Sequence, residues 1–358
     1  KTTAYPMCAF SSYSPQMTKS VTGGGYTMAL LIISLFSTFS IAAYDADAGE
    51  WGVAVASCVP FAYHSVAWAE AGVGAVATQS WTNHFYGTDG LALLGSGLTA
   101  DSVVFLLTAG DSLRDQRQLG IVDRYGNTAS FTGEGCADWA GSIQGDGYTI
   151  QGNILTGPEV VTAMEEAFLE TESYPLAERL YASLVAGEAA GGDSRGRQSA
   201  GILVVREGSG HDGATDRFVE LVVNDNPDPL VVLGAHLYTW ELYNCFPVYA
   251  SEMEEDPISE QRMIHLLQRL AYEGSDNPQL LNLGAWELAI RDLMLDEAVE
   301  MALKAVELAP EDFNIRDTLA EALFRNGDTE GAVEQALVAL ELDPENIYLQ
   351  EQLERFSN

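Results

Sequence analysis

Strand-like and helical runs do not alternate one by one between residues 38 and 225, and this order restricts the fold. Hairpin-like strand pairs occupy residues 38–60 and 118–133, whereas two consecutive helices are expected over residues 157–187. A parallel α/β sheet needs strict alternation of strands and helices. The order therefore predicts an α+β fold in which stacked, mostly antiparallel sheets carry helices on the outside.

The chain is strongly acidic. Its 17 basic and 52 acidic residues give a formal net charge of −35, and its only lysines are Lys1, Lys19 and Lys304. Nucleic acids and anionic membranes bind proteins through Lys and Arg contacts to phosphates. The charge therefore argues against both as partners, while a hydrophobic content of 47% indicates a folded core rather than general disorder.

Residues 1–37 differ from the rest of the chain, because an apolar run, Met28–Phe36, ends almost directly before Thr38 and a strand-like segment. The run is too short to span a bilayer, so no membrane span is expected. It fits the core of a signal peptide with Lys19 upstream, which would make the protein secreted or periplasmic. Two other interpretations stay open: translation beginning at Met28, which would leave the protein cytoplasmic, or a propeptide that the protein removes itself. All three place a cut near Thr38.

The C-terminal part of the chain has a 34-residue period that begins after an acidic, proline-bearing linker at residues 250–262. The repeated positions are Ala298, Ala302, Ala305, Leu308 and Pro310, which recur as Ala332, Ala336, Ala339, Leu342 and Pro344. This pattern resembles tetratricopeptide repeats. It implies a small all-α domain over residues 263–358 that binds a protein partner or another copy of the chain as a homo-oligomer, although such repeats also serve as caps.

The usual catalytic signatures are missing in the sequence contexts that they require: there is no GxSxG nucleophile elbow between a strand and a helix, no phosphate-binding loop, no HExxH and no dinucleotide fingerprint. The histidines and cysteines show no metal-ligand spacing, so neither a metal nor a cofactor is expected. Cys58 and Cys136 both follow strand-like runs and would form a disulfide in an exported protein. Two buried free thiols are the alternative.

Polar residues stand at strand ends and in glycine turns within otherwise apolar stretches. They are Gln79, Gln151, Asn153, Asp193, Arg195 and Gln198. Polar groups in such places must be hydrogen-bonded or must face a ligand. Several uncharged amides beside one Asp/Arg pair favour recognition of a small, amide-bearing molecule over a dry core.

The stretches that carry these residues include "QGNIL" and "AAGGDSRGRQSA", and in their order after "TFSIAAYD" they resemble domain of unknown function 1028. That family is grouped with the N-terminal-nucleophile (Ntn) hydrolases. The resemblance implies a four-layer αββα sandwich over residues 38–249, with two antiparallel sheets face to face. It also implies a nucleophile at the first residue of the mature chain, which corresponds here to Thr38.

This resemblance implies cleavage of an amide bond in a small molecule or peptide. A threonine hydroxyl needs a base, and a freed α-amine with a pKa near 8 lies within reach of its own side chain. Because no lysine lies between Lys19 and Lys304, the α-amine of Thr38 must be that base. Asn153 is expected to stabilise the oxyanion and Asp193 to orient the amine. The expected substrate-binding residues are Ser57, Gln79, Gln151, Arg195 and Gln198.

Two other functions stay open at this stage. While residues 1–37 remain attached, Thr38 has an amide nitrogen and no basic amine, so the mechanism cannot operate. The alternative is a non-catalytic module that binds a ligand in the same place and assembles through its repeats. A third interpretation is a scaffold in which only the repeats act.

Overall fold

The computed structural model describes residues 38–210, 213–252 and 256–357 of the 358-residue chain. The interpretations of residues 1–37 as a signal peptide or propeptide therefore concern a segment outside the described residues. Within them, two sheets precede a long series of helices, so the expected α+β class is confirmed. None of the described helices is both long enough and apolar enough to cross a membrane.

The strands form two antiparallel sheets. The larger sheet has the order β10–β9–β2–β1–β8–β7, with β1 (Thr38–Asp45), β2 (Glu50–Ser57), β7 (Gly141–Gly145), β8 (Tyr148–Asn153), β9 (Ser199–Val205) and β10 (Arg217–Val223). The smaller sheet has the order β3–β4–β5–β6, with β3 (Ala67–Glu70), β4 (Gly74–Ser80), β5 (Arg117–Asp123) and β6 (Thr128–Thr132). The strand β1, which begins at Thr38, lies in the interior of the larger sheet between β2 and β8.

Asparagine, aspartate and glycine residues close the two expected hairpins. In the β1–β2 turn, Asp45 Oδ1 accepts hydrogen bonds from the backbone N–H groups of Asp47 and Ala48. In the β5–β6 turn, the carboxylate of Asp123 accepts from backbone N–H groups in the same way, and Gly126 takes a φ of +82°, which glycine adopts without strain.

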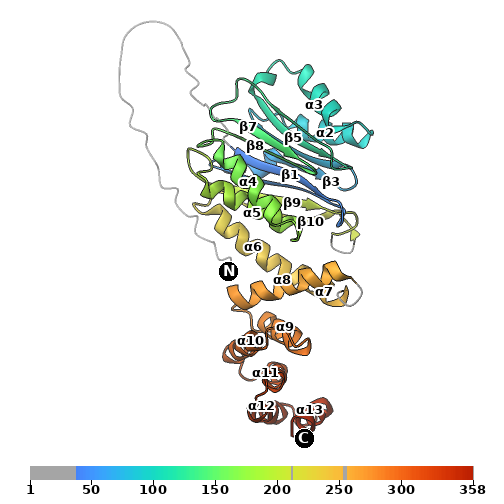
Figure 1. Ribbon diagram of the computed structural model, residues 1–358, viewed down its shortest axis with the longest axis vertical. Coiled ribbons are helices and arrows are strands. Elements are labelled where there is room, and N and C mark those ends of the chain that lie inside the picture. Colours follow the sequence, from blue (N-terminus) through green and yellow to red (C-terminus); the bar gives the residue numbers. More distant parts are fainter. Residues whose placement is uncertain (1–37, 211–212, 253–255, 358) are drawn as a thin grey trace, which may run out of the picture. The chain divides into compact units, whose positions relative to one another are not determined.

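Helices cover both outer faces of the paired sheets (Figure 1). The larger sheet packs against α4 (Glu159–Glu170), α5 (Leu176–Ala189) and α6 (Pro229–Asn244). The smaller sheet packs against α2 (Phe85–Gly95) and α3 (Ala100–Ala109). A short helix, α1 (Tyr63–Val66), connects β2 to β3, and a 3₁₀ turn, η1 (Arg114–Gln116), connects α3 to β5. The two sheets contact each other through β1, β2, β4, β5 and β8, so the order of layers is helices, sheet, sheet, helices.

The remaining helices form the C-terminal region. They are α7 (Phe246–Glu252), α8 (Pro257–Glu273), α9 (Pro278–Ile290), α10 (Leu295–Leu308), α11 (Phe313–Arg325), α12 (Thr329–Leu342) and α13 (Ile347–Ser357). The expected linker at residues 250–262 thus contributes to α7 and α8 on either side of residues 253–255. The small residues of the 34-residue period are buried on α10 and α12, namely Ala298, Ala302, Ala305, Ala332, Ala336 and Ala339. Every described element of this region is a helix, and the likeness of the region to tetratricopeptide repeats stays a prediction.

Candidate active site

Strand periodicity explains which side chains enter the space between the two sheets. On β1, Phe39 and Ile41 face the core under α4 and α5, whereas Ala42 faces the smaller sheet. Because successive residues of a strand point to opposite faces, Thr38 and Ser40 lie on the side of Ala42. The same alternation sends Ser57 of β2 and Asn153 of β8 into this space. The sequence therefore directs polar groups from neighbouring strands towards one end of the inter-sheet layer.

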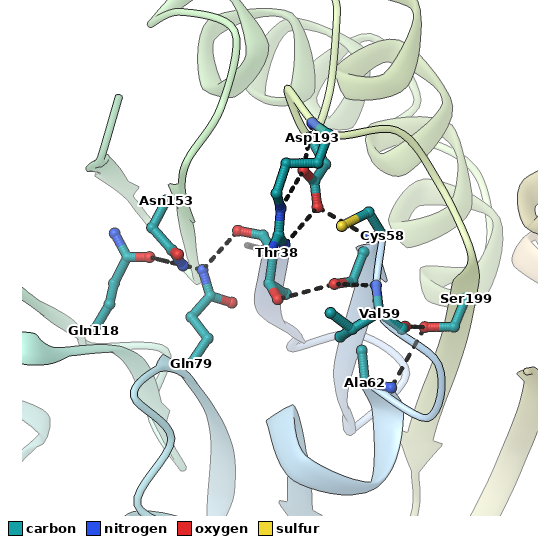
Figure 2. Close-up of polar contacts among 11 residues, drawn as sticks. Thr38, Cys58, Val59, Ala62, Gln79, Gln118, Asn153, Asp193 and Ser199 are labelled. Carbon is teal, nitrogen blue, oxygen red and sulfur yellow. Dashed lines mark hydrogen bonds and ion pairs between the residues drawn. The ribbon is translucent and has the colours of Figure 1, made fainter. Parts of the chain in front are cut away.

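Thr38 lies at the centre of this end of the layer (Figure 2). It is the cross-strand partner of Asn153, and its Oγ1 donates a hydrogen bond to Ser57 Oγ over 3.3 Å. Ser57 in turn lies beside Ser199, its cross-strand partner on β9. Thr38 is only 1% exposed. The hydroxyl thus sits in a packed, polar environment.

A network of side-chain amides links the two sheets beside Thr38. Gln79 Nε2 donates to the carbonyl oxygen of Thr38 over 3.1 Å and to Gln118 Oε1 over 2.8 Å. Gln118 Oε1 also accepts from Asn153 Nδ2 over 3.1 Å. Each of these amides is at most 1% exposed. The smaller sheet therefore fixes the backbone carbonyl of Thr38 and the side chain of Asn153.

Gln151 belongs to the same network but lies one step deeper. Its Nε2 donates to Ser40 Oγ over 2.7 Å, and Ser40 in turn donates to Gln79 Oε1 over 2.6 Å. Gln151 Oε1 accepts a hydrogen bond from Thr149 Oγ1 over 3.1 Å. The same oxygen lies close to the backbone of Gly120, where the Cβ of any other residue would come within 2.0 Å of it, so this position requires glycine. Gln151 thus supports Ser40 and Gln79, and its amide is occupied by protein groups.

Asp193 and Arg195 approach the site from the glycine-rich segment that follows α5. Asp193 Oδ2 accepts from the backbone N–H of Cys58 over 2.9 Å, and its Oδ1 accepts from the backbone N–H of Arg195 over 3.0 Å. The Arg195 guanidinium pairs with the same carboxylate at 3.2 Å, with the arginine side chain 31% exposed and the aspartate side chain 1% exposed. The Asp193 carboxylate therefore holds the backbone at Cys58, directly after Ser57. Arg195 is the solvent-facing member of the ion pair.

Gln198 is not brought together with the other amides. Its side chain donates to Asp225 Oδ1 over 2.7 Å, away from the inter-sheet layer. Its backbone N–H does contact the site, since it donates to the carbonyl oxygen of Ser57 over 2.8 Å.

The cysteines near the site are free thiols in the structure, so the disulfide between Cys58 and Cys136 is not formed. Burial, and then the neighbouring Asp193 carboxylate, raises the pKa of the Cys58 thiol to about 11. Burial also raises the pKa of Cys136. Both therefore stay protonated near neutral pH and are poor nucleophiles.

Sequence reasoning did not single out Gln118, Ser40 or Ser199. Ser199 Oγ donates to the carbonyl oxygen of Val59 over 2.6 Å and shapes the loop after Ser57. A usable signal was present for Gln118, because it is a lone amide at the start of an apolar strand, as Gln79 is at the end of another. No group of three or more His, Cys, Asp or Glu side chains suited to a metal ion occurs among residues 38–210, 213–252 and 256–357.

Comparison with known proteins gives a family for the sheet-bearing part of the chain. Residues 38–233 match the sequence profile of the "Family of unknown function (DUF1028)". A solved structure, "Crystal structure of protein SPO2555 from Silicibacter pomeroyi, family-model DUF1028", is 31% identical with a TM-score of 0.52, and the match covers 57% of this chain and 89% of that one. The structure of Naa15/Naa10 bound to HypK-THB matches 37% of this chain and 22% of its own at 19% identity, but its TM-score of 0.26 is too low to carry an argument. No curated protein matches the chain. Since the profile covers more than half of its length, the chain belongs to DUF1028, a family of unknown function.

Proposed function

We propose that this protein is an Ntn-type hydrolase that cleaves an amide bond of a small molecule or peptide, with Thr38 as the nucleophile after removal of residues 1–37. The observation that carries the proposal is the position of Thr38. It opens an interior strand of the larger sheet, and its hydroxyl meets Ser57 at the end of the inter-sheet layer where the strand ends converge. The family match also begins at residue 38, so the unit shared with relatives starts at the proposed nucleophile.

The base in this mechanism is the α-amine that cleavage would expose on Thr38. A free α-amine has a pKa near 8, so an appreciable fraction is neutral around neutral pH. In the uncut chain the same nitrogen is an amide and accepts no proton. The described residues contain a single lysine, Lys304, which lies on α10 in the C-terminal region, so the sheets offer no lysine as a substitute base.

The reaction follows the usual course of acyl transfer. Thr38 Oγ attacks the substrate carbonyl carbon, its proton passes to the α-amine, and that proton then goes to the leaving nitrogen as the C–N bond breaks. Water hydrolyses the resulting ester and restores the hydroxyl. Removing one oxyanion donor typically lowers the rate by about 100-fold or more.

Neighbouring groups have distinct roles in this proposal. Asn153, held by Gln118, is the proposed oxyanion donor, and Ser57 positions the Thr38 hydroxyl. Asp193 fixes the loop after Ser57, while Arg195 presents a half-exposed guanidinium to the substrate. Gln79 and Gln151 act indirectly, since their amides hold the backbone of β1 rather than facing a ligand. Cys58 does not compete as the nucleophile because its raised pKa keeps it protonated.

The same proposal covers the finer fold assignments. The layer order of helices, sheet, sheet and helices supports an Ntn-hydrolase-like αββα sandwich. The buried alanines at the 34-residue spacing support tetratricopeptide-like repeats in the C-terminal helices, which would bind a protein partner or a second copy. Export to the periplasm or outside the cell would follow if residues 1–37 act as a signal peptide.

One observation favours the alternative of a non-catalytic ligand-binding or assembly module. Thr38 is only 1% exposed in the structure, and a nucleophile must be reached by its substrate. The two functions differ in the state of the mature protein, because the hydrolase requires loss of residues 1–37 and the binding module does not.

The first test is the intact mass and N-terminal sequence of the protein purified from its native host. The hydrolase requires a mature chain that begins at Thr38. The second test compares Thr38→Ala with Thr38→Ser in the mature form on a panel of primary and secondary amides, with the released amine measured by fluorescamine. We expect Thr38→Ser to retain turnover and Thr38→Ala to lose about 1,000-fold or more. A native chain that keeps residues 1–37, or unchanged turnover in Thr38→Ala, would eliminate the nucleophile assignment.

A further inference from the structure

The helices that cover the smaller sheet have an apolar outward side. α3 contains five consecutive apolar residues, Val103–Leu107, and the first two are buried in the core of the smaller sheet. Phe105 and Leu106 point away from that core and are 68% and 50% exposed. On α2, beside α3 on the outside of the sheet (Figure 1), Phe85 is 69% exposed. A helix that is apolar on all sides is normally covered on all sides, so this surface indicates a contact with another protein.

A groove between the two helices makes the same surface self-complementary. Its volume is 660 Å³, within the range of about 300 to 1,000 Å³ that is typical of ligand-sized recesses. Its apolar walls are formed by Phe85, Ala92, Leu93, Leu106 and Leu107. Phe105 stands beside the groove on α3 without lining it. This surface, which we call the α2–α3 face, therefore carries both a projecting aromatic ring and a recess for one.

The α2–α3 face carries few charged groups for a chain this acidic. Residues 81–113 contain three aspartates and no glutamate, lysine or arginine. Two of the aspartates, Asp89 and Asp111, line the groove, and Asp111 is paired with Arg117 at 2.8 Å. On the opposite outer layer, α4 alone carries four glutamates and no basic residue. The two helical layers therefore present different surfaces, carboxylates on α4 and apolar side chains on α3.

This distribution of charge favours a second copy of the chain as the partner. A net charge of −35 attracts basic partners, but these would dock where carboxylates are dense, and the α2–α3 face has few. Two copies repel each other over most of their surface, and the repulsion is weakest where charged groups are fewest.

The shape of the face favours the same partner. A two-fold contact uses the same surface on both molecules, so a surface with one projection and one recess satisfies both at once. We propose that two copies of this chain associate through the α2–α3 face, with Phe105 of each copy inserted into the groove of the other. This interface is independent of the proposed hydrolysis and of any assembly through the C-terminal helices.

The first test is analytical ultracentrifugation of the full chain at about 1 to 100 µM, a range that measures micromolar dissociation constants. We expect a dimer. Raising NaCl from about 0.1 to about 1 M should strengthen it, because salt screens the repulsion between two acidic copies and leaves the apolar contact intact. A chain that stays monomeric throughout, or a dimer that salt dissociates, overturns the proposal.

A matched pair of leucines locates the interface. Leu106 on α3 and Leu169 on α4 are both 50% exposed, so glutamate can replace either one at the surface. Leu106→Glu places a carboxylate in the interface of both copies and should weaken the dimer about 100-fold or more. Leu169→Glu should leave the dissociation constant within about twofold of its original value. Equal association of the two variants overturns the assignment to the α2–α3 face.

Hydrogen exchange of the unaltered protein keeps the test decisive even if Leu106→Glu fails to fold. Peptides from α2 and α3 should exchange more slowly at concentrations where the dimer predominates than after dilution. Peptides from α4 and from α10 to α13 should exchange equally at both concentrations. Protection that is absent from α2 and α3, or that falls on the C-terminal helices instead, overturns the proposal.

Discussion

Replacing Gln118 by methionine tests whether the amide network holds the inter-sheet layer together. Gln118 is 0% exposed and lies on β5, opposite the end of β1 that carries Thr38. Its Oε1 accepts from Gln79 and Asn153, while its Nε2 lies 2.8 Å from the carbonyl oxygen of Gly152 and 3.0 Å from Thr132 Oγ1. Methionine has nearly the same length and shape but makes none of these hydrogen bonds.

The expected loss of stability follows from those contacts. The substitution removes up to four hydrogen bonds, each of which contributes about 1 kcal/mol, and leaves buried donors and acceptors without their partner. Gln79 keeps its hydrogen bond of 3.1 Å to the carbonyl oxygen of Thr38, so it loses only one of its partners. The extra apolar surface of methionine offsets a fraction of the loss. We therefore expect the free energy of unfolding of the sheets to fall by about 3 to 5 kcal/mol.

The measurement must separate the sheets from the C-terminal helices, because the two regions need not unfold together. Hydrogen exchange in increasing urea, read by mass spectrometry on peptides from β1 and β8, gives the local free energy of opening. Gln198→Met is the matched control, since it makes the same chemical change where the side chain has one hydrogen bond, to Asp225, at the surface. We expect it to lose less than about 1 kcal/mol. A Gln118→Met variant that is no less stable than this control would refute the argument that the amides join the sheets.

Two further predictions concern titratable groups. Burial raises the pKa of Glu50 from its ordinary 4.5 to about 7 despite the nearby Arg206. Because the folded-state pKa lies above the unfolded one, the contribution of Glu50 to the free energy of unfolding is fully present below pH 4.5 and is lost as the pH rises through 7, by on the order of 3 kcal/mol. Glu50→Gln should remove this contribution to the pH dependence in urea titrations. An unchanged slope in the variant contradicts the assignment. Because the pKa of Cys58 is raised, we expect iodoacetamide to alkylate its thiol at pH 8 about 100-fold more slowly than a free thiol. The rate should be faster in Asp193→Asn. Site-resolved mass spectrometry measures both rates. Labelling of Cys58 at the rate of free cysteine would contradict the raised pKa, and an equal rate in Asp193→Asn would show that the carboxylate does not contribute to it.

The fold class could be predicted from the sequence because the patterns that indicate it are local. Alternation of apolar and small residues marks the strands, and the two consecutive helices after residue 157 appear as α4 and α5. Carboxylate-closed turns fix the hairpins without help from distant residues. The identity of the family was equally accessible, since short polar stretches between strands carry it and residues 38–233 match its profile.

The roles of individual polar residues were harder to predict, because they depend on how the sheets stack. Gln79, Gln118 and Gln198 look alike in the sequence as lone amides at the edges of apolar runs. Stacking buries the first two against each other, whereas the third follows a glycine turn at residue 196 and pairs with Asp225 instead. No periodicity extends through that turn, so its side-chain direction could not be inferred. Strand parity could have identified Gln118 together with Gln79 once β4 and β5 were paired, since the two are cross-strand partners.

The use of amides rather than charges in the inter-sheet layer has a chemical consequence for the proposed mechanism. A lysine beside Thr38 would lose most of its hydration and would need a carboxylate partner, which would couple the position of the nucleophile to pH. Glutamine and asparagine side chains are neutral at every pH and can both donate and accept, so Gln79, Gln118 and Asn153 satisfy one another without a counterion. A freed α-amine on Thr38 would then be the group whose protonation changes near neutral pH within an otherwise fixed frame. Such a frame suits a nucleophile that must serve as its own base, because the geometry around it does not change when the base gains or loses its proton.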